Sequence, residues 1–96
     1  MVVGILQVRL TIDHAHSLKD KRRVVTSLKD RLHREQLVSV AEVDAHDLHN
    51  TAMLGVAVAS SSVKHCQSVI DRVLNKIRQQ RDCVIADHTM EILTGH

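Results

Sequence analysis

The 96-residue chain is short enough that we expect a single domain over residues 1–96, with no more than a two-layer core. The composition is 44% hydrophobic and 25% charged, with no Pro and 3 Gly. It therefore differs from the low hydrophobicity and high net charge that are typical of disordered chains. The formal net charge is +2, and the lack of any Phe, Tyr or Trp excludes the stacking of bases on these three kinds of ring.

Residues 1–12, with the sequence MVVGILQVRLTI, alternate apolar and polar side chains and predict a half-buried strand over residues 2–12. The two faces of this strand are formed by Leu6, Val8, Leu10 and Ile12 and by Gln7, Arg9 and Thr11. The segment has no basic leading stretch, and Gln7 and Arg9 interrupt its apolar run. We therefore expect neither a secretory signal nor a membrane span, and we place the protein in the cytoplasm.

A helix is predicted from about residue 18 to residue 35. Ser17 suits the N-cap, and Asp20, three residues on, makes a variant of the capping box. Lys21 falls on the apolar stripe of this helix, where a lysine cannot stay buried without a partner. We expect it to extend to the acidic loop and pair with Asp44 or Asp47, pinning that loop rather than acting in catalysis. The other members of the stripe are Leu18, Val25, Leu28 and Leu32.

Two strands, a second helix and a last strand follow. The β-branched run from Val38 to Val43 predicts the second strand, and the alternating run from Thr51 to Ala59 predicts the third. Ser60–Ser62 supply the cap of the second helix, which we expect to end near Arg81. Its predicted buried stripe is Val63, Cys66, Ile70, Val73, Leu74 and Ile77, and the fourth strand is marked by Val84, Ala86, Met90 and Ile92.

This order of elements predicts an α+β fold, a ferredoxin-like βαββαβ plait. Right-handed crossovers place both helices on one face of a four-stranded antiparallel sheet whose first and third strands are central. The other face is left open, and we expect Arg9 there to reach Asp87 or Glu91. Because its centre is flat and largely apolar, we expect a homodimer that pairs either these faces or the edge strands. The central positions are Ile5, Gln7, Arg9, Met53, Gly55, Ala57 and Ala59.

Histidine and acidic side chains gather in two predicted loops, with Asp13, His14 and His16 after the first strand and Asp44, His46, Asp47 and His49 after the second. These strands are parallel in the expected fold, so both loops lie at one end of the sheet. Such groups suit zinc binding or proton transfer, although no HxH or HExxH pattern lies on a rigid element. A metal site and a set of solvent-exposed loop side chains remain alternatives. The candidate cluster is His16, Lys21, Asp44, His46, Asp47 and His49.

No catalytic residue and no cofactor is predicted. Cys66 and Cys83 are too few and too far apart for a zinc or redox motif, and we expect buried thiols. Glu42, in the second strand, is interpreted as a strand-edge charge rather than a general base, unless it reaches the loop cluster. Gly4 and Gly55 do not form a phosphate-cradling sequence.

At HSLKDKRRVV (His16–Val25), VSVAEVD (Val38–Asp44), the Asp47-Leu48 pair and LGVAVAS (Leu54–Ser60), the chain resembles the YlxP-like family of small bacterial proteins. The resemblance spans essentially the whole chain. It implies a ferredoxin-like fold, a bacterial cytoplasmic protein and no established biochemical activity. Members of that family often lie in operons with translation-initiation and ribosome-maturation factors, which suggests RNA as a partner. Many relatives carry an aromatic residue where this chain has His49.

Charge is the most informative feature once it is sorted by element. The helical segments 17–35 and 62–81 hold 12 of the 13 Lys and Arg residues with only four acids, a net of +8, and the remainder carries −6. A basic layer suits phosphate backbones, so the leading hypothesis is a non-enzymatic RNA- or ribosome-associated accessory protein. A metal-binding or small hydrolytic protein and a purely structural homo-oligomeric adapter are the alternatives. The candidate nucleic-acid-binding residues are Lys19, Arg22, Arg23, Arg34, Lys64, Arg72, Lys76 and Arg78.

Overall fold

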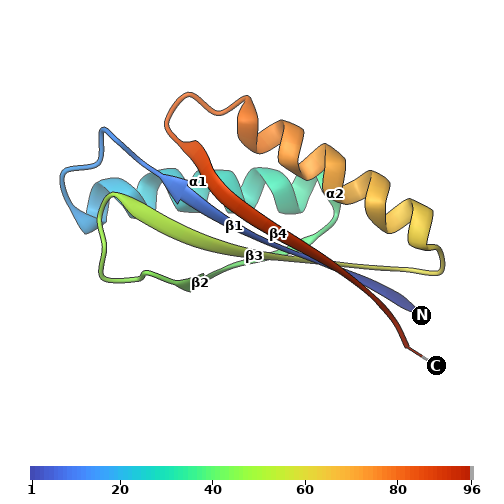
Figure 1. The fold of residues 1–96 in the computed structure, drawn as a ribbon. Coiled ribbons are helices and arrows are strands. Elements are labelled where there is room, and N and C mark those ends of the chain that lie inside the picture. Colours follow the sequence, from blue (N-terminus) through green and yellow to red (C-terminus); the bar gives the residue numbers. More distant parts are fainter. Residues whose placement is uncertain (96) are drawn as a thin grey trace.

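A four-stranded antiparallel sheet with two helices on one face makes up the part of the chain that the computed structural model describes, residues 1–95 (Figure 1). The strand order is β2-β3-β1-β4, with the two central strands predicted from the sequence. The ferredoxin-like fold is therefore confirmed. The elements are β1 (Val2–Thr11), α1 (Leu18–Gln36), β2 (Ser39–Asp44), β3 (Thr51–Ser60), α2 (Val63–Arg78) and β4 (Val84–Thr94).

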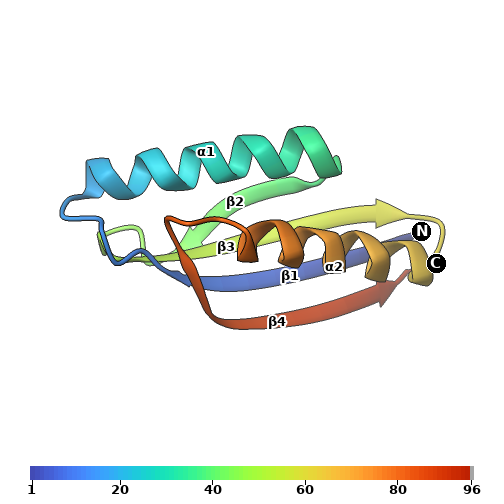
Figure 2. The same ribbon diagram turned by 90° about the horizontal axis from the view of Figure 1, so that it is seen from above.

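The core lies between the sheet and the two helices, which run side by side over it (Figure 2). α1 contacts β2 and β3, whereas α2 contacts β1, β3 and β4. In the central strand pair Leu6 lies opposite Val56 and Val8 opposite Leu54, and all four side chains are buried. The alternation read from the sequence therefore assigns the faces of β1 and β3 correctly.

The first helix begins and ends with side-chain and backbone caps. Ser17 Oγ accepts a hydrogen bond from the Asp20 backbone N–H at 3.1 Å, which confirms the predicted N-cap. Asp20 Oδ2 accepts a hydrogen bond from the His16 backbone N–H at 3.0 Å. In a standard capping box this second bond would come from the backbone N–H of the N-cap itself, Ser17, rather than from the residue before it. At the other end Leu37 takes the left-handed conformation, φ 55°, while its N–H bonds the His33 carbonyl oxygen at 3.1 Å.

Replacing Leu37 with glycine is expected to raise the free energy of unfolding by about 1 kcal/mol, because glycine adopts a positive φ without steric cost. Leu37 is 84% exposed, so little packing is lost. Urea unfolding measures the change. As a matched control, Arg22→Gly in the exposed interior of the same helix should lower stability by roughly 0.5–1 kcal/mol. A loss of stability in Leu37→Gly would contradict the argument.

The sequence-based assignment of α2 needs two corrections, whereas β4 lies where the sequence predicts the fourth strand. α2 ends at Arg78 rather than near Arg81, and Val63, expected in its buried stripe, is 39% exposed in the first turn. β4 is an edge strand whose pairing with β1 shifts register between Arg9 and Leu10. Val84 and Met90, which marked this strand in the sequence, lie within it as predicted and are 60% and 49% exposed.

The face of the sheet away from the helices carries the side chains predicted for it. Ile5 lies opposite Ala57, Gln7 opposite Gly55 and Arg9 opposite Met53. Arg9 also lies opposite Asp87 in β4. The expected ion pair is not formed, however, because within residues 1–95 no carboxylate lies within 4 Å of the Arg9 guanidinium. Asp87 Oδ1 instead accepts the His88 backbone N–H at 2.8 Å.

Both cysteines are free and buried, as predicted. Burial raises the pKa of the Cys83 thiol, with a further contribution from the charge of Asp82. No helix within residues 1–95 has the length and apolar character needed to cross a membrane.

Candidate nucleic-acid interface

Most of the candidate basic side chains are exposed on the helical layer. They lie on α1 and α2 away from the buried stripes, because the apolar residues of each helix turn toward the sheet at helical spacing. Lys19 and Arg34 are 15 residues apart, so the basic ridge of α1 extends over about 22 Å. The exposed candidates are Lys19, Arg22, Arg23, Arg34, Lys64, Arg72 and Arg78. None of these seven forms an ion pair within residues 1–95.

Lys76 differs from the other candidates because it is half-buried and paired. Its Nζ lies 3.5 Å from Glu35 Oε2, and Arg31 Nε lies 3.6 Å from Glu35 Oε1. Glu35 therefore links the two helices and partly neutralises the positive charge between them. We remove Lys76 from the set of free cations predicted from the sequence.

Arg23 stands beside the capped end of α1. The pKa of the Asp20 carboxyl is held below its ordinary value, chiefly because the His16 backbone N–H donates to it. Burial opposes this shift, and the Ser17 side chain and the charge of Arg23 add to it. The carboxylate thus complements both the N–H groups and the positive end of the helix.

Replacing Asp20 with asparagine is expected to lower the free energy of unfolding near neutral pH. A carboxyl whose pKa is lowered on folding stabilises the protein above its unfolded-state pKa of 3.8. That contribution is lost as the pH falls through the lower folded-state pKa. The stability gap between wild type and variant should therefore be full at about pH 6 and close below pH 3.8 in urea titrations. Asp30→Asn, in the exposed middle of α1, is the matched control that removes one negative charge without changing the cap.

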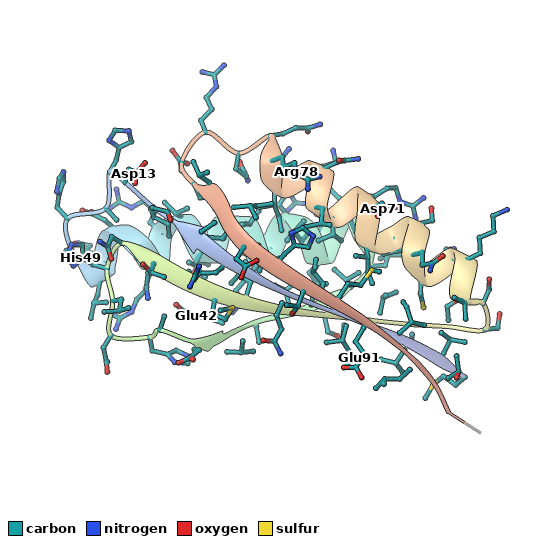
Figure 3. The ribbon with its side chains drawn as sticks, viewed as in Figure 1. Asp13, Glu42, His49, Asp71, Arg78 and Glu91 are labelled. Carbon is teal, nitrogen blue, oxygen red and sulfur yellow. The ribbon has the colours of Figure 1, made fainter. Side chains whose placement is uncertain are left out.

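The loops after β1 and β2 and before β4 meet at one end of the sheet, as the parallel directions of β1 and β2 require. Figure 3 shows Asp13 and His49 at this end.

Lys21 of α1 is buried at the same end of the sheet and is only 1% exposed. Its Nζ donates hydrogen bonds to the carbonyl oxygens of Ala45 at 2.8 Å, Thr51 at 3.2 Å and His46 at 3.3 Å. Lys21 thus holds both ends of the β2–β3 loop through backbone atoms.

The acid beside Lys21 is Glu42 rather than Asp44 or Asp47, which corrects the partner expected from the sequence. Lys21 Nζ lies 2.9 Å from Glu42 Oε2. Four oxygens thus surround an ammonium that has only three protons. The three carbonyls take the directed hydrogen bonds, so Glu42 Oε2 is paired by charge but receives no well-aligned hydrogen bond. This arrangement is a structural clamp, with Glu42 facing the helices because its partner in β3, Leu54, is a core residue.

The other members of the loop cluster are not gathered around a common point. His46 Nε2 lies 3.0 Å from the Glu42 carbonyl oxygen, and Asp44 Oδ1 accepts the Ala45 N–H at 2.7 Å. The side chains of His16, Asp47 and His49 are exposed and make no hydrogen bond or ion pair within residues 1–95. In the same part of the chain, no group of three or more His, Cys, Asp or Glu side chains is placed to hold a metal ion.

A pocket of about 330 Å³ separates the first half of α1 from the loop before β4. Sequence reasoning missed Asp82 as a neighbour of Asp20 and Arg23, because nothing in the local pattern of either segment indicates that the loop before β4 lies beside α1. The pocket has an apolar floor and a rim of mixed charge. Its lining is Ile12, His14, Ala15, Asp20, Arg23, Val24, Ser27 and Asp82.

Three solved structures share the fold at low identity. A de novo designed protein with a ferredoxin fold is 18% identical, with a TM-score of 0.55 over 99% of this chain and 88% of that one. A structural-genomics target, protein YJCS, is 11% identical, with a TM-score of 0.55 over 93% and 96%. A protein of Agrobacterium tumefaciens is 15% identical, with a TM-score of 0.54 over 100% and 94%. These likenesses concern the fold alone.

At the level of sequence, the chain matches one family model and no curated protein. A family model described as "Protein of unknown function (DUF503)" matches residues 3–90. No curated protein matches the chain. The family description assigns no activity, in agreement with what the resemblance to YlxP-like proteins implies.

Proposed function

The chain belongs to the DUF503 family of proteins of unknown function, and on that premise we propose that it is a non-enzymatic RNA- or ribosome-associated accessory protein that binds through its helical layer. One observation carries the proposal. Seven exposed cations stand on α1 and α2 without an acidic partner within residues 1–95. Unpaired positive charge spread over one face attracts phosphate backbones.

The mode of binding follows from the side chains available. With no Phe, Tyr or Trp, the chain lacks the rings on which RRM-type sheets stack bases, and contacts to phosphates carry little sequence information. We therefore expect affinity that depends strongly on salt and weakly on RNA sequence. The acids outside the helices, such as Glu91 on the opposite face (Figure 3), orient the protein with its helices toward the RNA.

The test is fluorescence anisotropy with a labelled RNA hairpin over a series of salt concentrations. Each neutralised phosphate adds about 0.7 to 0.9 to the slope of log K against log salt. The triple variant Arg22→Gln, Arg23→Gln, Arg72→Gln should therefore reduce the slope by about 2 to 3 and weaken binding to unrelated hairpins alike. In parallel, wild type should co-sediment with ribosomes at low salt and be released at high salt.

Arg9→Gln is the control, since it removes one positive charge from the opposite face of the sheet. Its slope should equal that of wild type, with the mass of each variant checked so that altered self-association is not mistaken for altered binding. The proposal would be refuted if the wild type showed no affinity for RNA at low salt and did not co-sediment with ribosomes. Within residues 1–95, no group of three or more His, Cys, Asp or Glu side chains is placed to support the alternative of a metal-binding loop site.

A further inference from the structure

The sheet face away from the helices is apolar at its centre and has no covering element within residues 1–95. A shallow groove of about 350 Å³ runs along it between β2 and β1, floored by Gly55. Val43 leans over Gly55 from the β2 side, with Cγ1 2.8 Å from the position a Cβ would take there. The residues that line the groove are Ile5, Gln7, Ser39, Val40, Ala41, Val43, Gly55, Val56 and Ala57.

The same face carries charges that are unpaired within residues 1–95. Arg9 is the sole Lys or Arg residue of the chain outside the helical segments. Two acids, Asp87 and Glu91, face it from β4, since Asp87 is opposite Arg9 and Glu91 is opposite Ile5. Neither carboxylate lies within 4 Å of a cationic side chain in this range. The face therefore offers a second copy an apolar centre and charges of both signs, one cation and two acids.

We propose that a second copy of this chain covers this face, related by a two-fold axis that lies in the interface and crosses the strands at Gln7. In β1, Arg9 and Ile5 stand two residues to either side of Gln7, and Ile5 pairs with Glu91. The rotation therefore brings Arg9 of one protomer to the level of Ile5 and Glu91 in its partner. The contact occurs twice, as an isologous interface requires.

The distances involved suit such a contact. Packed sheets lie about 10 Å apart, and neighbouring strands about 4.8 Å apart, a separation that an arginine and a glutamate side chain span together. Gly55 and Ala57 have no side chain or a small one, so the centre of the face does not hold two packed sheets further apart than this distance. The four strands, of 10, 6, 10 and 11 residues, cover roughly 600 Å² per protomer, or about 1,200 Å² in total, which is the lower end of specific interfaces.

Charge also selects this face over the other. The helical segments carry a net +8, so two copies meeting through α1 and α2 would repel each other. Edge pairing through β2 is disfavoured by the register irregularity between Glu42 and Asp44, which disrupts the pattern of free backbone groups. Meeting through the open faces leaves both basic layers outside.

The test is a charge exchange followed by light scattering and sedimentation. Wild type should show twice the 10.8 kDa chain mass. Arg9→Glu and Glu91→Arg should each raise the dissociation constant by about a hundredfold, because like charges then meet twice in each dimer. An equimolar mixture of the two variants should recover the dimer, since every contact in the mixed pair is again opposite in sign. Within a single chain, the double variant Arg9→Glu, Glu91→Arg should recover it as well.

The same rotation brings Asp87 to the level of the partner's Glu91, since these two acids stand two residues to either side of Thr89, which is opposite Gln7. Asp87→Asn is therefore the matched control, because it removes an acid that faces an acid and should strengthen the dimer rather than weaken it. Ala57→Lys should break the dimer by placing a charge in the centre of the face. Circular dichroism shows whether each variant is folded, which we expect for changes at exposed positions. A wild type of single-chain mass overturns the proposal. So does a doubled mass that survives Ala57→Lys, or a mixture of variants that fails to associate.

Discussion

Replacing Lys21 with methionine is expected to lower the free energy of unfolding by about 3–5 kcal/mol, the cost of removing one partner from a buried ion pair. Lys21 is 1% exposed, and the Glu42 side chain is 16% exposed. Methionine fills the volume of the alkyl stem but leaves the carboxylate without its counter-charge. It also leaves three carbonyl oxygens, those of Ala45, His46 and Thr51, without their donor.

Urea unfolding of three further variants separates these contributions. Lys29→Met, on the same helix and without an ion pair within residues 1–95, should change stability by less than about 1 kcal/mol. Lys21→Met, Glu42→Met removes the stranded charge and should recover part of the loss, the remainder belonging to the carbonyl oxygens. Lys21→Arg keeps the positive charge beside Glu42. Its stability can be compared with that of Lys29→Met even if Lys21→Met does not fold. Equal losses in Lys21→Met and Lys29→Met would contradict the clamp.

Replacing Gly4 with valine should cost about 1–3 kcal/mol, the usual range for overpacking a filled core. A Cβ at Gly4 would lie 2.9 Å from Ile70 Cδ1, 3.0 Å from Val58 Cγ1 and 3.3 Å from Cys66 Cβ. The Ile70 contact is the end of a flexible side chain, but Cys66 Cβ is fixed by the α2 backbone. The two γ-methyl groups of valine then have no free volume, and α2 must move away from β1.

A double-mutant cycle with Ile70→Val tests this account. Ile70→Val removes the Cδ1 atom that the new Cβ would meet, and alone it should cost about 0.5–1.5 kcal/mol. The pair should be more stable than the sum of the single changes by at least about 0.5 kcal/mol, because the second change relieves the first. Additive losses would mean that the cost of valine at Gly4 arises elsewhere, for example at Val58.

The loop cluster shows where local patterns stop being informative. A lysine on the apolar stripe of α1 indicated a buried amine with a partner across the core, but the partner was assigned to the wrong acids. The alternation of Val38, Val40 and Glu42 contained the correct signal, because it places Glu42 on the face toward the helices. The register shift before Asp44 then directs the Asp44 carboxylate to its own loop N–H.

Sequence by itself determined the element order, the buried faces of β1 and β3, the α1 N-cap and the net charge of the helical layer. Each depends on side chains within a few residues of one another, and a period of two or of 3.6 suffices to place them. Only the tertiary structure decided that Glu42 pairs with Lys21, that Glu35 ties Lys76 to α1 and that Arg9 has no acidic partner within residues 1–95. These pairings depend on strand register and helix crossing, which are set by packing between segments distant in the chain.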